Sequence, residues 1–189
     1  MHYSAFYELF PEVAERETRN IILQKSKDID SKYINLSGEY SFVEAYCDEK
    51  NCDCRRVFLN VLSPKSRGTL AVIAYGWESK KYYSKWMGEA EESVISTLFG
   101  ASLNLASPQS SVAPQLLELV KDVLLSDSIY VERIKQHYKM YRQKIDEKYL
   151  ARPIAKPTIK ISRNACCICG SGKKHKKCCG RVLSRAEAY

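Results

Sequence analysis

A cysteine-rich run near the C-terminus carries the clearest chemistry in this sequence. Five of the eight cysteines lie between residues 166 and 179, interleaved with glycine and lysine. Four of them form a C-x-C-x8-C-C pattern, namely Cys167, Cys169, Cys178 and Cys179. Zinc binds four thiolates in a tetrahedron, and two close cysteine pairs joined by a short loop are able to supply them. The spacing therefore predicts one zinc ion at these four residues.

The predicted site is structural rather than catalytic. All four zinc positions are filled by the protein, whereas catalytic zinc keeps one position for water. The loop between the pairs is too short to bury apolar surface, so we expect it to fold only with its ion. Gly170 and Gly172 allow a sharp turn after the first pair.

Two disulfides are the alternative use of these cysteines. Residues 1–6 lack the basic flank and apolar stretch of a signal peptide, so we expect a cytoplasmic protein. A reducing compartment favours metal over disulfide, and adjacent Cys178 and Cys179 are awkward disulfide partners. No apolar stretch approaches the length of a membrane span.

The run resembles the SEC-C motif, a zinc-binding module of the SecA preprotein translocase and of many unrelated bacterial proteins. The resemblance covers residues 163–180 and includes Gly-Ser-Gly-Lys-Lys at 170–174, the lysine pair at 176–177 and the closing cysteines. Cys166 and Ile168 stand where the family usually has proline, and His175 where it usually has tyrosine. The resemblance implies a zinc-dependent contact module, which in the translocase contacts an export chaperone and the ribosome. It does not imply translocase activity, because no G-x-x-x-x-G-K-[ST] loop is present.

The positive charge of the chain is concentrated in the same region. The formal net charge is +8, and residues 149–189 hold ten Lys and Arg against one acidic residue. Such a basic segment favours acidic or phosphate-rich partners, although lysines also keep a coreless module soluble. The candidate partner-binding residues are Lys173, Lys174, Lys176 and Lys177.

The other three cysteines form a second cluster, C-x4-C-x-C, at Cys47, Cys52 and Cys54. The cluster falls between two predicted strands, where a turn could bring the three sulfurs together. Three thiolates lack one ligand for a second zinc site. The alternatives are buried thiols that pack as small apolar groups, or a catalytic thiol, which needs a nearby base. The candidates for the fourth ligand are His2, His137, Asp53 and Cys166.

Regular elements around these sites predict an α+β fold with an antiparallel sheet. Residues 21–23, 40–47, 55–62 and 69–77 are rich in strand-forming residues, and the last two segments predict a hairpin. Apolar periodicity predicts helices at 89–99, 112–125 and 128–149, and Pro11 is suited to open a short one. Strands followed by helices are typical of α+β domains.

The predicted organisation is an α+β domain at residues 1–149, a linker at 150–162 and a zinc-binding tail at 163–189. Two prolines in the linker favour extended chain. The chain also shows a weaker resemblance to uncharacterised bacterial proteins that carry SEC-C tails, at residues 9–12, 52–56 and 75–77.

Three functions follow from these features. The first is a zinc-binding protein whose tail docks to a partner such as the ribosome or a chaperone. The second is a nucleic-acid-binding protein that uses the tail lysines, with Tyr82, Tyr83 and Trp86 as stacking groups, although packing of these rings in the domain is the favoured interpretation. The third is an enzyme that uses Cys47, Cys52 and Cys54; it ranks last because no acid–base set accompanies them.

Overall fold

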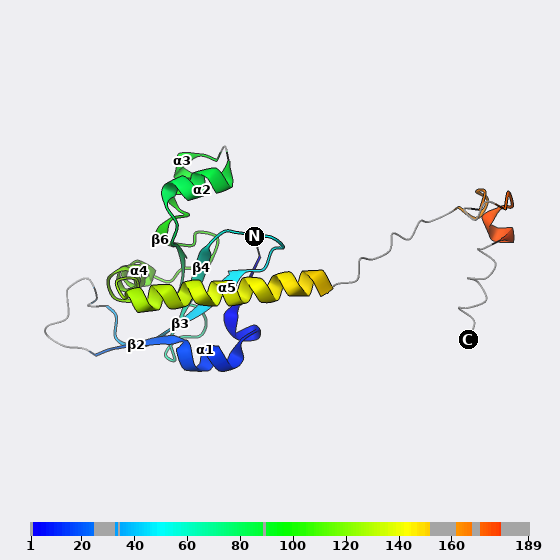
Figure 1. The fold of residues 1–189 in the computed structure, drawn as a ribbon. Helices are drawn as coiled ribbons and strands as arrows, with labels where there is room; N and C mark the ends of the chain where they lie inside the picture. Colours follow the sequence, from blue (N-terminus) through cyan, green and yellow to red (C-terminus); the bar gives the residue numbers. More distant parts are fainter. Residues whose placement is uncertain are drawn as a thin grey trace. The chain divides into compact units, whose positions relative to one another are not determined.

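The computed structural model describes residues 2–24, 33, 35–88, 90–151, 162–167 and 171–178. The chain divides into two compact units, Met1–Ala151 and Arg152–Tyr189 (Figure 1). The first is called the body and the second the tail unit. Most of the predicted linker lies outside the described residues.

The body is built on a six-stranded antiparallel sheet with the strand order β1-β3-β4-β5-β6. The strand β2 also pairs with β3, beside the segment that β1 covers. The strands are β1 Tyr3–Ala5, β2 Arg19–Leu23, β3 Gly38–Cys47, β4 Arg56–Leu62, β5 Ala71–Gly76 and β6 Gly100–Leu103. The long strand β3 therefore organises one side of the sheet, and its last residue is Cys47.

Helices surround this sheet (Figure 1). They are η1 Phe6–Glu8, α1 Pro11–Glu17, α2 Lys80–Met87, α3 Glu92–Ser96, α4 Ala113–Leu119, the π-helical turn η3 Val120–Leu124, and α5 Ser128–Ala151. The helix α5 crosses one face of the sheet. Its buried apolar side chains recur every three or four residues, which places them on one side of the helix; they are Tyr130, Ile134, Tyr138, Tyr141 and Ile145.

The main core lies between α5 and the sheet. Tyr46 on β3 is fully buried, and its hydroxyl donates to Glu44 Oε2 at 2.6 Å and to Ile134 O at 3.1 Å. Leu59 on β4 is also fully buried in this cluster. Burying such a side chain contributes about 1.5–3 kcal/mol. The body thus has an apolar core of its own.

The α+β prediction is confirmed, including the 55–62 and 69–77 hairpin, which is β4 pairing with β5. The helix expected at 89–99 is shorter, because only Glu92–Ser96 is helical and Gly100 starts β6. The helix expected at 112–125 changes to π geometry after Leu119. None of the helices in the described part of the chain combines the length and apolar character needed to span a membrane.

Candidate metal centres

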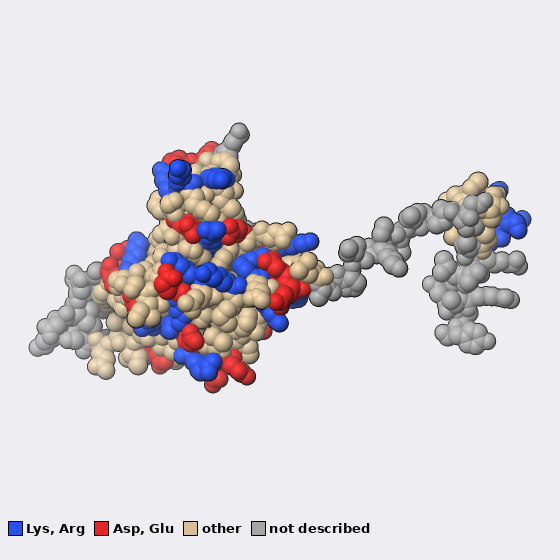
Figure 2. Space-filling view, in the orientation of Figure 1, with Lys and Arg blue, Asp and Glu red and all other residues tan. Residues whose placement is uncertain are grey.

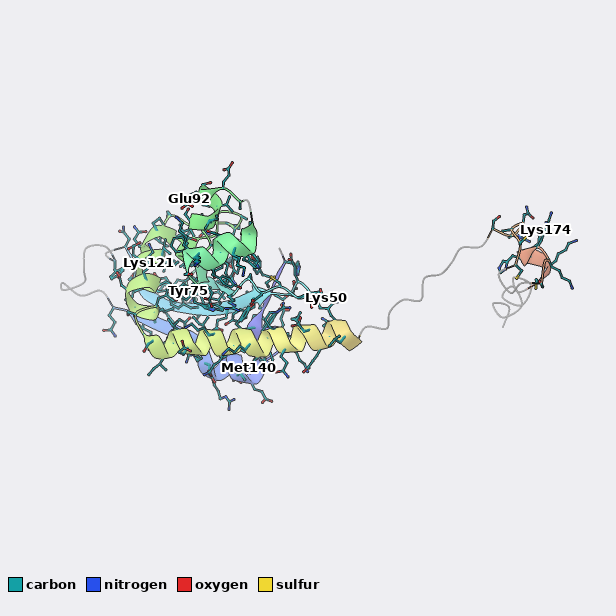
Figure 3. All side chains as sticks on the ribbon, turned by 45° about the horizontal axis from the view of Figure 1, so that its top comes forward. Lys50, Tyr75, Glu92, Lys121, Met140 and Lys174 are labelled. Carbon is teal, nitrogen blue, oxygen red and sulfur yellow. The ribbon has the colours of Figure 1, made fainter. Side chains whose placement is uncertain are left out.

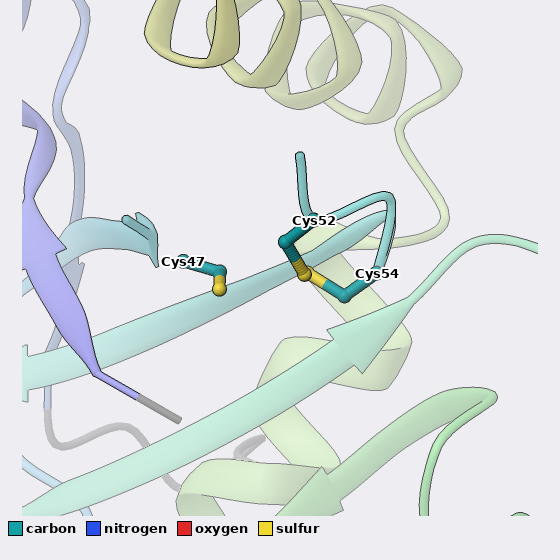
Figure 4. Close-up of side chains that lie close together, drawn as sticks. All are labelled: Cys47, Cys52 and Cys54. Atoms are coloured by element: carbon teal, nitrogen blue, oxygen red, sulfur yellow. The ribbon is translucent and has the colours of Figure 1, made fainter. Parts of the chain in front are cut away.

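The body brings its three cysteines to one place. Cys47 ends β3, and Cys52 and Cys54 lie in the loop of residues 48–55 that leads to β4. Their three sulfur atoms all lie within 4.8 Å of one another (Figure 4). Cys47 and Cys54 are buried, Cys52 is half-buried, and all three are free thiols. The C-x4-C-x-C spacing therefore did indicate a spatial cluster.

Two residues of this loop have backbone conformations that residues other than glycine rarely adopt. Asn51 has φ of 56° and Arg55 has φ of 47°, both in the left-handed region. The amide of Cys52 donates to Glu49 O at 3.3 Å, which closes a turn inside the loop. Such backbone strain persists only where surrounding contacts enforce it.

Arg142 on α5 is one of those contacts. Its side chain is buried, and Nη1 donates to Cys47 O and to Glu49 O, each at 2.9 Å. Nη2 donates to Asp146 Oδ1 at 2.6 Å. The guanidinium thus fastens the beginning of the cysteine loop to the long helix.

The pKa values of the three thiols are shifted in opposite directions. Hydrogen bonds donated by Cys47 and Cys54, with the positive charge of Arg142, hold the pKa of Cys52 well below its usual range. A hydrogen bond with Cys52 and burial raise the pKa of Cys47, and hydrogen bonds with Cys47 and Cys52, together with burial, raise the pKa of Cys54. The backbone amide of Glu49 also donates toward Cys47, and that of Cys54 toward Cys52. The loop therefore favours negative charge on Cys52 and disfavours it on Cys47 and Cys54.

The proposed fourth ligands in the body are engaged elsewhere. No His, Asp or Glu from the described residues joins the three sulfurs in a group of ligand atoms. His2 Nδ1 donates to Asp48 Oδ2 at 2.6 Å. Asp53 accepts two hydrogen bonds from Arg55, at 3.0 and 3.1 Å. Cys166 lies in the tail unit, whose placement relative to the body is not determined.

His137 belongs to a different buried network. Its Nδ1 lies 2.8 Å from Glu44 Oε2, and its Nε2 lies 3.2 Å from Glu17 Oε2. The ring of Phe6 stacks on it at 4.4 Å. Glu44 and Glu17 lie 93 and 120 residues away from His137 along the chain. The sequence pattern therefore gave no indication of these two contacts. His137 thus stabilises the core instead of completing the cysteine cluster.

A cavity lies next to the cysteine loop. It measures about 500 Å³, and its lining includes Asp53 and Arg55, the two neighbours of Cys54. Trp77 and Tyr138 form another part of the lining, with their rings 5.2 Å apart. The Tyr138 hydroxyl accepts from Arg55 N at 3.3 Å. Space for a small molecule is therefore present beside residues 53 and 55 of the loop, although none of the three cysteines lines it.

The tail unit is held by a short backbone frame. Cys166 and Lys174 form an antiparallel bridge, and the amide of Cys167 donates to Lys173 O at 2.8 Å. The turn η4, His175–Lys177, then leads to Cys178, whose amide donates to His175 O at 3.0 Å. Cys167 is buried, and its sulfur lies 3.7 Å from His175 Nδ1. Cys169 and Cys179, the other two predicted ligands, lie outside the described residues, as does Gly170.

The turn after the first cysteine pair uses Gly172 as predicted. Its φ is 68°, a conformation that costs a residue with a side chain about 1–2 kcal/mol. Glycine adopts this conformation without that cost.

All four candidate lysines of the tail are exposed. Figure 3 shows Lys174 projecting from the tail unit, and Figure 2 shows Lys and Arg on its described surface. The described tail residues include no acidic side chain. On the body, by contrast, acidic and basic side chains are interspersed (Figure 2). The charge asymmetry expected from the sequence is thus found at the surface.

One ring of the aromatic and basic segment of the body is unavailable for stacking. Tyr83 on α2 is fully buried, and its hydroxyl donates to Arg55 O at 2.9 Å. Tyr82 donates to Asp53 O at 2.6 Å, while the Arg55 guanidinium lies 4.7 Å from its ring centre. The proposed stacking role of Tyr82, Tyr83 and Trp86 is therefore wrong for Tyr83, because that ring is buried in a cluster with Ile95 and Leu98.

Comparisons with known proteins address the tail most strongly. The family model described as the SEC-C motif matches residues 163–181. The protein translocase subunit SecA of Thermodesulfovibrio yellowstonii is 56% identical over 39 residues, which are 21% of this chain and 4% of that protein. A UPF0225 protein of Yersinia pestis is 76% identical over 21 residues, which are 11% of this chain and 14% of that protein.

One further match is longer. The SecA subunit of Syntrophotalea carbinolica is 29% identical over 111 residues, which are 57% of this chain and 10% of that protein. The chain thus spans about a tenth or less of the length of the translocase subunits that it matches. No solved structure matches it. The family model thus shows that this protein carries a SEC-C motif at residues 163–181.

Proposed function

We propose that the tail, residues 163–189, is a zinc-dependent docking module joined through residues 150–162 to a separately folded domain, residues 1–149. Cys167, Cys169, Cys178 and Cys179 hold the ion in a closed, structural site. His175 lies beside Cys167, where a ring N–H stabilises a thiolate ligand.

The partner contact is made by Lys173, Lys174, Lys176 and Lys177. The single observation that supports it is the exposure of all four lysines on a small unit whose described residues include no acidic group. A partner rich in acidic groups or phosphates complements this surface. The proposed partner is the ribosome or a chaperone, in a cytoplasmic setting, and several relatives are protein translocase subunits by name.

The experiment compares three full-length proteins after recovery from extract of the source cells. One is unchanged, one has alanine at the four tail lysines, and the control has alanine at four exposed body lysines, Lys50, Lys65, Lys81 and Lys85. The control matches the change of charge. Ribosomal proteins and chaperones are quantified by mass spectrometry, and bound zinc is measured in each sample.

We expect the tail variant to keep its zinc and to lose about tenfold in partner recovery, because each surface charge contributes up to about 1 kcal/mol. The control variant keeps both. Equal recovery with the tail variant contradicts the proposal. Recovery that depends only on free RNA, and weakens steeply with salt, favours the nucleic-acid alternative instead.

A further inference from the structure

We propose that the body holds a second zinc ion at Cys47, Cys52 and Cys54, with the fourth position left to water or to another small donor molecule. Such a site differs in kind from the closed site of the tail. It does not depend on the docking function proposed above.

The first support is the fit of the sulfur atoms to the ion. Zinc–sulfur bonds of about 2.3 Å in a tetrahedron place sulfurs about 3.8 Å apart. The three sulfurs of the body lie within 4.8 Å of one another. An ion at their centre therefore needs only small side-chain adjustments.

The second support is the set of groups around the sulfurs. The amide of Cys52 donates to Glu49 O at 3.3 Å, which holds the turn that carries this cysteine. Metal ligands in proteins are commonly oriented by such neighbouring hydrogen bonds. Arg142 adds buried positive charge and fixes the carbonyl of Cys47. A zinc ion with three thiolates is formally −1, so nearby cationic charge stabilises the loaded site.

The third support concerns the open position. Among the described residues, no other His, Asp or Glu joins the group, and the three body candidates are held by other partners. Cys52 is the accessible member of the set, while Cys47 and Cys54 are buried. Zinc bound by three protein ligands and one exchangeable donor is the arrangement of reactive zinc sites. The cavity beside Asp53 and Arg55 gives a small molecule room next to this loop.

The test counts zinc in full-length proteins that were purified under reducing conditions and folded with zinc. We expect two ions in the unchanged chain, one in Cys52→Ser, and one in a variant with serine at all four tail ligands. Cys166→Ser is the control, because Cys166 is an exposed cysteine; it is expected to keep two. Circular dichroism checks that each variant remains folded.

Several outcomes overturn the proposal. If the tail-ligand variant contains no zinc, the second site is refuted, whether or not the unchanged tail binds an ion. A Cys52→Ser variant that keeps the full zinc content refutes it as well. Should Cys52→Ser fail to fold, the zinc content of the tail-ligand variant decides alone. Loss of one ion in Cys166→Ser refutes the open position, because the tail then supplies the fourth ligand.

A second measurement probes the open position directly. Cobalt replaces zinc in the tail-ligand variant, and the visible absorption spectrum is recorded while azide is added. We expect the cobalt bands to shift as azide takes the fourth position. An unchanged spectrum means a closed site and contradicts the exchangeable ligand.

Discussion

The two cysteine clusters of this protein use the same side chain in opposite structural settings. In the body, the cysteines lie at the end of β3 and in the next loop, against a sheet and a long helix that have their own core. In the tail, the described frame consists of a bridge, a few backbone hydrogen bonds and one helical turn. The body therefore positions its thiols by means of its own core, whereas we propose that the tail takes its structure from the metal.

Removal of metal should separate the two regions most strongly. Structural zinc contributes about 10–16 kcal/mol to small modules, so a strong chelator should abolish the amide protection of residues 162–178. The body should keep its protection because its core is apolar. Hydrogen exchange followed by mass spectrometry measures both regions in one sample. A body that unfolds on chelation would contradict the contrast.

A cavity introduced into the body core by mutation should destabilise the body and leave the tail unchanged. Leu59 is fully buried, so Leu59→Ala should lower the free energy of unfolding of the body by about 2–5 kcal/mol. Zinc in the tail should remain unchanged. Leu105→Ala is the matched control, because that side chain is 87% exposed and its loss should change stability by less than about 0.5 kcal/mol. Loss of tail zinc in the Leu59 variant would show that the regions are coupled.

Arg142 tests how the helix holds the cysteine loop. Arg142→Gln should leave Cys47 O or Glu49 O unpaired, which costs about 1–3 kcal/mol of body stability. Zinc affinity of the body site should fall as well, and that of the tail should not. Lys144→Gln, an exposed position on the same helix, serves as the control. Denaturant unfolding and zinc competition titrations give the two values, and equal results for both variants would remove Arg142 from the account.

Gly172 gives the smallest expected effect and concerns the tail alone. Gly172→Ala should cost about 1–2 kcal/mol because of the positive φ, which is roughly a fivefold to thirtyfold loss of zinc affinity. Gly172→Asn should cost less, because asparagine tolerates this conformation better. Competition with a chromophoric chelator measures both. Unchanged affinity in the alanine variant would mean that the turn adapts without strain.

The sequence predicted the long elements of the fold well. Apolar residues alternate or cluster over enough length to predict three strands clearly, at 40–47, 55–62 and 69–77. The apolar spacing in residues 128–149 predicted the helix α5 equally clearly. Strands β1 and β6 were missed because three or four residues are too short for a period. The helix predicted at 89–99 shrank to Glu92–Ser96, since tertiary pairing of β6 with β5 takes the end of that segment.

The candidate sites were predictable only where the residues concerned lie close together along the chain. Close cysteines along the chain indicated the cluster in the body, and the turn at Gly172 was indicated by its residue type. The environment of His137 was not predictable from the sequence, because Glu17 and Glu44 approach it only in the folded chain. The same holds for Arg142, whose contacts with Cys47 and Glu49 join residues more than ninety positions apart.

X-ray absorption at the zinc edge most directly tests the claim that the two sites are unlike. It should be recorded on Cys52→Ser, which isolates the tail site, and on the tail-ligand variant, which isolates the body site. The account predicts four sulfurs at about 2.3 Å for the tail, and three sulfurs with one lighter atom at about 2.0 Å for the body. Four sulfurs in both variants, or no zinc in the tail-ligand variant, would contradict it.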